Sequence, residues 1–481
     1  MPSKGNRRGW RGWLKSGSYS LLTIFTALLV LACSTSVAPS IDANIDANEP
    51  SSADTAADTL TILWDKGYVI EEDEAIQQVV DDWNSQGHSA QLSFYTSSEI
   101  APKTLRASQT GQQPDILFAA KSVYPVTDWK GKLADVTPVV ARLAGSYSPE
   151  ALQAAKVYGA QEAVNGAEKV RYYAVPINQS FTHIYYWKDL LADAGYTPAD
   201  IPRDWDAFWA FWKTVQTQLA ASHPALRSLG LPYSVPALDT YHIFEQVLLA
   251  YDVQLLDEQG QLQVDNPQVK AKIVDCLDWY LQFYEQGFVP PDAVAWADTD
   301  NNRQMLNRQV VMTPNPTLSI PAALRNDEKA YREQLGIVEF PHKPSGEPMP
   351  HLVDIRLAIV FKDSPNQAAA RDFLSYLTQP EVLSQFLKAS YGRFMPPALN
   401  QIEADPFWQN PDDPHVYTSV KTMTEGRSHP FYNVLNPAYG TVMESNVWGQ
   451  AIYDMAAEGR SAEAAADWAI ARIQEIFQTS A

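Results

Sequence analysis

The stretch Leu60-Thr61-Ile62-Leu63-Trp64 decides the fold, because it opens a regular alternation of strand and helix patterns. Its unbroken apolar character is typical of a buried strand. A helix pattern and a second strand pattern follow, carried first by Ile76, Val79, Val80 and Trp83 and then by Ala90, Leu92 and Phe94. Another helix-sized stretch ends near Gly111, and 114–119 is a third short apolar run. Strand, helix, strand, helix, strand predicts an α/β fold with a parallel sheet.

Ligands of parallel sheets bind at the carboxyl ends of the strands. This rule selects two candidate groups at the ends of the first and third strand patterns: Trp64, Asp65 and Lys66, and Lys121 and Ser122. An alternative for Asp65 is a helix-capping role, with Lys66 as a solvated surface residue.

Beyond residue 200 the patterns are mostly helical. Asp204 is predicted to cap a helix that begins at Trp205. A strand pattern returns at Leu357–Phe361. Ser364 is expected to cap the helix that follows, and Thr378 to open the next one through a capping box with Glu381.

The N-terminus has the pattern of an export signal. Residues 1–32 contain five basic residues and no acidic one, and the apolar run 21–29 is too short to span a bilayer. Val30-Leu31-Ala32-Cys33 resembles a bacterial lipobox, which implies that residues 1–32 are removed and that Cys33 carries a lipid. We therefore expect an exported protein of the cell envelope, lipid-anchored and facing the periplasm or the extracellular side. The alternative is an N-terminal anchor helix with an incidental cysteine.

Residues 33–58 are predicted to be a flexible linker, since they are polar, lack aromatic residues and contain a short Ile-Asp-Ala-Asn repeat. Loss of the signal changes the net charge from −20 to −25 (−20 − 5). Such acidity argues against nucleic acid as a partner. Cys276 is the only cysteine besides Cys33, so no internal disulfide is expected. No metal or cofactor is predicted, because no two of the eight histidines lie four residues apart.

Four stretches in order match a known family: 63–68, 111–118 with 131–136, 174–208, and 357–397. The most specific is the third, which contains Ala174-Val175-Pro176, Tyr185-Tyr186-Trp187-Lys188-Asp189-Leu190-Leu191 and Pro202-Arg203-Asp204-Trp205. With these stretches the chain resembles the extracellular solute-binding proteins of ABC importers, in the carbohydrate-binding group that includes maltose-binding protein. Two departures are Trp187, where an Asn is usual, and Lys121 with Ser122, where maltose-binding protein has a polar cluster with a carboxylate.

The resemblance implies a periplasmic-binding-protein fold, in which two α/β lobes are joined by a hinge and enclose a ligand cleft. Lobe one would comprise 60–174 plus 350–400, and lobe two 178–335 plus 401–481. The implied partners are a carbohydrate and the transmembrane subunits of an ABC permease, and we expect a monomer.

Sugar sites combine planar polar side chains with aromatic platforms. The remaining cleft candidates are residues of these types near expected crossings, loops and strand ends: Asn178, Gln179, Trp296, Asn315, Thr317, Asp354 and Tyr439. Each has an alternative. Asn178 and Gln179 would otherwise form a polar turn, Trp296 would belong to the core, and Asp354 would form a structural ion pair with Arg356.

The main rival class is an exported, lipid-anchored carbohydrate-active enzyme such as a glycoside hydrolase. A catalytic carboxylate pair stays possible, since acidic residues are abundant. The sequence has no Gly-x-Ser-x-Gly elbow, no His-Glu-x-x-His and no phosphate-binding loop. A third possibility is a membrane-tethered sensor protein with the same fold. The order of the four stretches and the lipobox favour the carrier.

Overall fold

The computed structural model describes residues 59–119, 131–156, 162–164 and 167–480. The predicted signal peptide, Cys33 and the whole predicted linker, as well as Lys121 and Ser122, lie outside these ranges. None of the helices within them is both long and apolar enough to cross a membrane.

The first sheet has the strand order β12-β11-β3-β1-β2, with β6 also paired to β11. Strands β1, β2 and β3 are parallel, as predicted, whereas β11 runs antiparallel to β3 and β6. The strands are β1 (Leu60–Asp65), β2 (Ala90–Tyr95), β3 (Ile116–Ala119), β6 (Ala174–Phe181), β11 (His351–Val360) and β12 (Ser428–Pro430). Around them lie α1 (Ile70–Ser85), α2 (Ser97–Gln109), α4 (Thr137–Ala141), α5 (Pro149–Lys156), α12 (Gln367–Leu377), α13 (Pro380–Ala389) and α14 (Leu399–Ala404), and the hairpin β4 (Glu162–Val164) and β5 (Ala167–Lys169).

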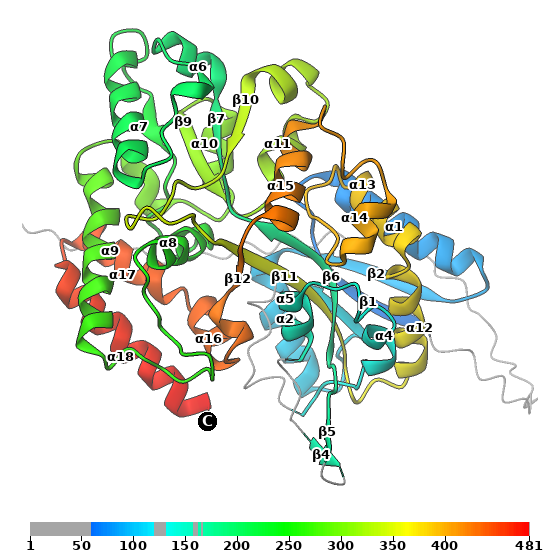
Figure 1. The fold of residues 1–481 in the computed structure, drawn as a ribbon. Coiled ribbons are helices and arrows are strands. Elements are labelled where there is room, and N and C mark those ends of the chain that lie inside the picture. The colour runs from blue at the N-terminus through cyan, green and yellow to red at the C-terminus, as the bar shows by residue number, and fades with distance from the viewer. Residues whose placement is uncertain (1–58, 120–130, 157–161, 165–166, 481) are drawn as a thin grey trace, which may run out of the picture. The chain divides into compact units, whose positions relative to one another are not determined.

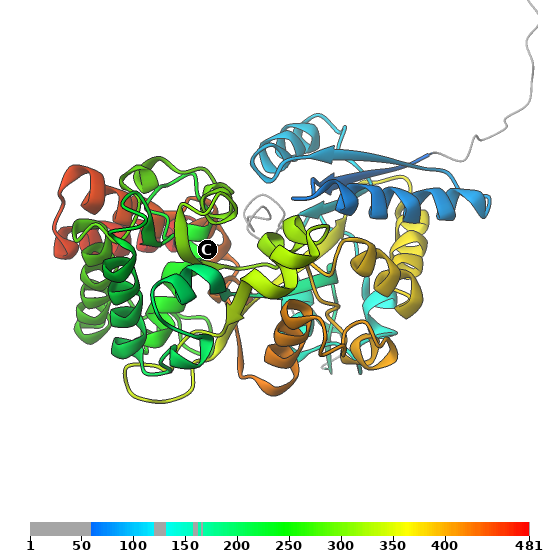
Figure 2. The same cartoon turned by 90° about the horizontal axis from the view of Figure 1, so that it is seen from above.

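The second sheet has the order β10-β7-β9-β8, and β7 is antiparallel to both of its neighbours. Its strands are β7 (His183–Trp187), β8 (Arg227–Leu229), β9 (Val310–Asn315) and β10 (Leu335–Val338). Its helices are α6 (Lys188–Asp193), α7 (Trp205–Leu219), α8 (Asp239–Ala250), α9 (Pro267–Glu285), α10 (Asp300–Leu306), α11 (Ser319–Leu324), α16 (Ala438–Glu444), α17 (Val447–Glu458) and α18 (Ala462–Ser480), with short turns η2 (Pro198–Asp200), η3 (Pro291–Ala295), η4 (Lys329–Gln334) and η5 (Tyr432–Val434). Figures 1 and 2 show the elements of the two sheets as separate groups.

The chain passes between the two sheets more than once. Only Thr182 separates β6 from β7, and 339–350 connects β10 to β11. Helix α15 (Pro414–Glu425) contacts both β10 and β6, and after β12 the chain continues into α16. Two sheets with helices, joined by crossing segments, confirm the predicted α/β two-lobed fold.

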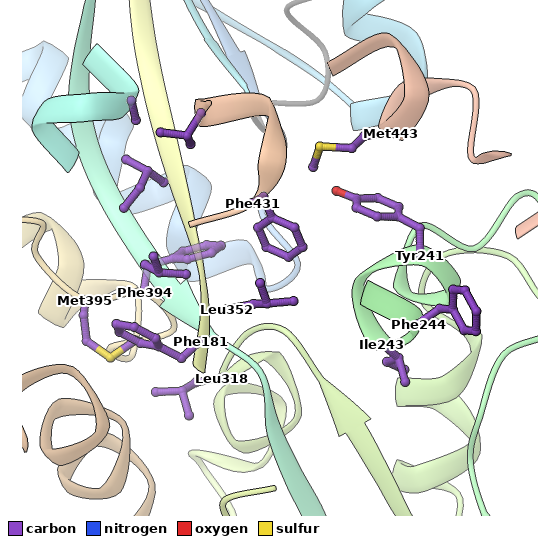
Figure 3. Close-up of a cluster of buried hydrophobic side chains, with 14 of the residues drawn as sticks. Phe181, Tyr241, Ile243, Phe244, Leu318, Leu352, Phe394, Met395, Phe431 and Met443 are labelled. Atoms are coloured by element: carbon purple, nitrogen blue, oxygen red, sulfur yellow. The ribbon is translucent and has the colours of Figure 1, made fainter. Parts of the chain in front are cut away.

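Apolar side chains fill the region where strands leave the first sheet. Figure 3 shows Phe394 and Met395 beside Phe181, the last residue of β6, and Phe431 near Leu352 of β11. Each of these five side chains is at most 4% exposed. Burial on this scale stabilises the crossing, at roughly 25 cal/mol for each Å² of apolar surface removed from water.

Helix starts follow the sequence where the capping residue has no other partner. Asp204 caps α7 as predicted, since its carboxylate accepts a hydrogen bond of 3.0 Å from the Ala207 amide. Two other predicted starts are wrong. Ser364 donates to the Asp115 carboxylate, and α12 begins at Gln367. Thr378 donates to the Leu374 carbonyl of the preceding helix and leaves α13 without a side-chain cap.

Candidate functional site

The carboxyl end of β1 carries the first part of the site. Trp64 is 3% exposed and stacks on Phe118 of β3, with ring centroids 4.0 Å apart. The next side chain, Asp65, points to the other face of the sheet because strand residues alternate. Its carboxylate accepts hydrogen bonds of 2.8 and 2.9 Å from the Ser97 hydroxyl at the start of α2. Trp64 and Asp65 thus point to opposite faces of the sheet, and both border the same cavity at the carboxyl end of β1.

Strand β11 adds a guanidinium and a second carboxylate. Arg356 Nη1 lies 3.4 Å from Asp65 Oδ2, and Arg356 Nε lies 4.0 Å from Asp354 Oδ2. The guanidinium also lies over the Phe394 ring, 4.4 Å from its centroid. Arg356 and Asp354 are two residues apart on one strand, so both side chains point to the same face of the sheet.

A second arginine follows α13. Both carboxylate oxygens of Glu72 accept hydrogen bonds of 2.9 Å from Arg393 Nη1. The Arg393 guanidinium lies 4.7 Å from the Phe394 centroid and 5.5 Å from that of Tyr68. The backbone carbonyl of Arg393 accepts a hydrogen bond from the Leu318 amide, which links this segment to the second lobe.

On the second lobe, a buried amide network forms the facing wall. The Asp239 carboxylate accepts hydrogen bonds from the side-chain amides of Asn301 (2.7 Å) and Asn315 (3.2 Å). Asn315 Oδ1 in turn accepts from the amide and the hydroxyl of Thr317. Burial raises the pKa of Asp239 well above its usual value, and the nearby Asp298 charge adds to this shift. Burial therefore favours the protonated form of Asp239, which anchors the wall through its hydrogen bonds to Asn301 and Asn315.

Tyr68 reaches from the first lobe toward this wall. Burial raises the pKa of its hydroxyl, although a hydrogen bond with Asn302 opposes the shift. Tyr241 and His242, at the start of α8, lie on the same wall, and their side chains are hydrogen-bonded to each other at 3.0 Å. Burial lowers the pKa of His242, which favours a neutral imidazole.

Three adjoining cavities lie between these groups. Arg356 and Arg393 line all three of them, and the largest encloses about 720 Å³. That volume lies within the usual range for small-molecule sites, about 300–1,000 Å³. Residues of both lobes border two of the cavities, the largest one and the one lined by Asn315 and Asp354. Together these cavities form an interlobe cleft. Within the residues that the structure describes, no cluster of three or more His, Cys, Asp or Glu side chains is placed to hold a metal ion.

The structure brings most of the described candidates together. Those that line the cavities are Trp64, Asp65, Lys66, Asn178, Asn315, Thr317 and Asp354. Three described candidates lie elsewhere: Gln179, Trp296 and Tyr439 are each at most 2% exposed and do not border these cavities. Gln179 donates to the Pro396 carbonyl, and Tyr439 donates to Glu245.

Two local expectations about these candidates are wrong. Asn178 and Gln179 were expected in a loop, but both lie within strand β6 and pair with β11. Asp354 was expected ahead of the returning strand, but β11 already begins at His351. In both cases the two crossing strands are longer than the apolar pattern, because polar residues there are buried and hydrogen-bonded in the sheet.

Several cleft residues escaped the sequence reasoning. Ser97 follows strand β2, so the rule of carboxyl strand ends would have found it if applied to the second strand. Tyr68 lies three residues beyond β1 and could have been found in the same way. Arg393 and Asp298 carry no local signal, because only the tertiary fold brings them to the cleft.

Comparison with known proteins agrees with this architecture. Residues 78–418 match the model of a family described as bacterial extracellular solute-binding protein, and the chain belongs to that family. No curated protein matches the chain in sequence.

Solved structures show the same fold. An ABC transporter solute-binding protein from Thermotoga lettingae TMO, bound with alpha-D-tagatose, is 18% identical with a TM-score of 0.70. Maltose-bound MalE3 of T. maritima is 18% identical with a TM-score of 0.69, and a sugar transporter protein from Arthrobacter chlorophenolicus A6 with bound laminaribiose is 14% identical with a TM-score of 0.69. Each alignment covers 87% of this chain and 99% of the other. At these identities the likeness concerns the fold.

Proposed function

We propose that this protein captures a carbohydrate in the interlobe cleft, without chemical turnover, and delivers it to the transmembrane subunits of an ABC permease. The observation that carries the proposal is the cleft itself, where carboxylate, amide and guanidinium groups are fixed beside the rings of Tyr68 and Phe394. Hydroxyl groups of a sugar need such donors and acceptors, and its apolar face needs a ring. The sugar ligands of the solved neighbours support the same ligand class.

The proposed contacts from lobe one are Asp65, Lys66 and Asp354, those from lobe two are Asn315 and Thr317, and Asn178 would contribute from the crossing strand β6. Lys121 and Ser122 stay proposals from the sequence. We further propose the lobe limits 60–174 plus 350–400 and 178–335 plus 401–481, with closure by hinge motion.

The proposal includes a tether. Residues 1–32 would be a signal peptide and Cys33 the lipid-bearing N-terminus, with a linker of about 25 residues spanning about 28 Å. Such a linker would keep a monomeric carrier near its permease and raise its local concentration there. Replacing Cys33 by Ser should move the protein from the membrane fraction to the soluble fraction. If the Cys33→Ser protein stays with the membrane, the tether proposal is wrong.

A thermal-shift screen with neutral mono- and oligosaccharides tests the main proposal. A ligand that binds only the folded state should raise the melting temperature. Asp65→Ala should reduce the shift, whereas Asp363→Ala, an exposed carboxylate just beyond the opposite end of β11, should not. Hydrolysis of a saccharide, with no saccharide that shifts the melt, would instead establish the glycoside hydrolase alternative.

A further inference from the structure

The charges that border the cleft are mostly negative. Among the described residues, six carboxyl groups besides the buried Asp239 line the three cavities: Asp65, Glu72, Asp73, Asp298, Asp354 and Glu444. The cationic side chains of the described part of the chain that line them are three, Lys66, Arg356 and Arg393, and Lys121 lies outside the described ranges. A cleft walled by one sign of charge concentrates ligands of the opposite sign. The full chain, at −20, adds to the same field.

The two arginines offset part of this negative charge, but each is already held by carboxylate partners and is not free to bind an anionic ligand. Arg393 is paired with Glu72, and both side chains are 11% exposed. Arg356 lies between Asp65 and Asp354, at 3.4 and 4.0 Å. An anionic ligand would have to displace these carboxylates, and breaking a buried pair is strongly unfavourable. Lys66 is exposed, so solvent screens its charge.

Two carboxylates on opposite lobes, those of Asp354 and Asp298, can still accept further hydrogen bonds. Among the described residues, Asp354 accepts no hydrogen bond and has only the 4.0 Å contact with Arg356, although its side chain is just 13% exposed. Asp298 accepts one hydrogen bond of 2.8 Å, from the Leu238 amide. Both line the same cavity, and the charges of both act on His242 in its wall. Two like charges in one cavity disfavour each other unless a ligand supplies donors or a cation between them.

A further hydrogen-bond acceptor, the side-chain oxygen of Asn178, lies in the cavity lined by Trp64 and Phe394. Asn178 is 2% exposed, lines this cavity, and its Oδ1 has no hydrogen-bond partner within the described part of the chain. It pairs across the sheet with Arg356, so this oxygen lies beside the same group of charges. A buried acceptor without a donor is costly and calls for a donor from the ligand.

From these observations we infer that the ligand is a saccharide carrying a protonated amine, such as an amino-sugar oligomer, held between Asp354 and Asp298. This inference rests on the proposed carrier function and narrows its ligand class. Neutral saccharides would bind more weakly through their hydroxyl groups, and the Arg356 and Arg393 ion pairs would disfavour uronic acids.

The experiment compares three oligosaccharide series of matched length by isothermal titration calorimetry: glucosamine oligomers, their N-acetylated neutral counterparts, and oligogalacturonates. Glucosamine oligomers should bind about tenfold more tightly than the neutral series, as expected for one partly desolvated charge pair. Added salt should weaken binding of the glucosamine oligomers much more than that of the neutral ones.

Variants test the assigned groups. Asp354→Asn and Asp298→Asn should each reduce the affinity for glucosamine oligomers by about tenfold, and reduce it more than the affinity for neutral oligomers, which lose only a hydrogen-bond acceptor. Asp363→Asn changes the net charge equally at an exposed position beyond the opposite end of the strand, and should change neither affinity. If a variant does not fold, the ligand preference and salt dependence of the unmodified protein decide.

The outcomes separate the two proposals. Equal affinity for cationic and neutral oligomers, or tightest binding of oligogalacturonates, would overturn the amine inference and leave the carrier in place. No binding of any saccharide, whatever its charge, would overturn the carrier proposal itself.

Discussion

The Glu72 carboxylate joins two segments that are far apart in the sequence. Arg393 Nη1 donates hydrogen bonds of 2.9 Å to both of its oxygens, and the backbone amides of Tyr68 and Val69 donate to Oε1 at 2.9 and 3.2 Å. The same side chain thus caps helix α1 and fixes an arginine of the cleft. Replacement of Glu72 should therefore affect both stability and binding.

Glu72→Ala should lower the free energy of unfolding by about 3 kcal/mol, because it leaves a largely buried guanidinium unpaired and removes the helix cap. Glu72→Gln should cost less, since its amide oxygen can still accept from the two backbone amides. Urea denaturation measures both effects. The matched control is Glu74→Ala, an exposed residue of the same helix, which should change stability by less than about 0.5 kcal/mol. An equal loss in both alanine variants would contradict this role.

Gln179→Ala should destabilise the protein rather than act on the ligand alone. The Gln179 side chain is 1% exposed, and its amide donates to the Pro396 carbonyl at 3.0 Å and to Met423 Sδ at 2.9 Å. Losing this bridge should cost about 1–3 kcal/mol in denaturant titration. Unchanged stability together with weakened saccharide binding would instead place Gln179 among the ligand contacts.

Glu245 should make stability depend on pH. Its side chain is buried with Tyr439 as its hydrogen-bond donor, and burial raises its pKa from 4.5 to about 8. The folded state therefore holds a proton that the unfolded state has lost, so stability should fall as pH rises from about 4.5 to about 8. Glu245→Gln should remove this part of the pH dependence and stabilise the protein most above pH 8. The exposed control Glu258→Gln should keep the dependence in thermal melts across this range.

His183 should make stability depend on pH in the direction opposite to that of Glu245. It lies at the crossing from β6 to β7, and burial, with a further contribution from His351, lowers its pKa from 6.5 to about 3. The unfolded state binds the proton first, so stability should fall as pH drops from 6.5 toward 3. Melts of His183→Gln should show a smaller acid-induced loss, and those of His88→Gln, at an exposed position, an unchanged one. An identical acid response in all three proteins would exclude this role for His183.

The sequence predicted the elements whose signals are local. The apolar run of β1 and the cap at Asp204 depend on neighbouring residues, and both are present in the structure. Ser364 and Thr378 have the right residue type for a cap, but the Ser364 hydroxyl donates to Asp115 and accepts from the Asn366 amide ahead of α12, and the Thr378 hydroxyl donates to Leu374 of the preceding helix. A tertiary partner therefore engages Ser364, whereas a local one in the preceding helix engages Thr378.

The same distinction applies to the candidate site. Asp65 was found because the carboxyl end of a parallel strand is a general ligand position. Arg393 reaches the cleft only after α13 has packed against α1, and no pattern near residue 393 indicates this. Trp296 and Tyr439 have the right chemistry for a sugar platform, but their rings are buried in the core.

The position of β11 determines when the first lobe can be completed. This strand pairs with β3 on one side and β6 on the other, yet it is formed by His351–Val360, far downstream of both. A nascent chain that ends before residue 351 therefore has β3 and β6 without the strand between them, and such long-range pairing is slow. For an exported member of this family, the delay is useful. The leading segments cannot complete their sheet while the rest of the chain is still being synthesised, which would keep them open enough to thread through a narrow translocation channel.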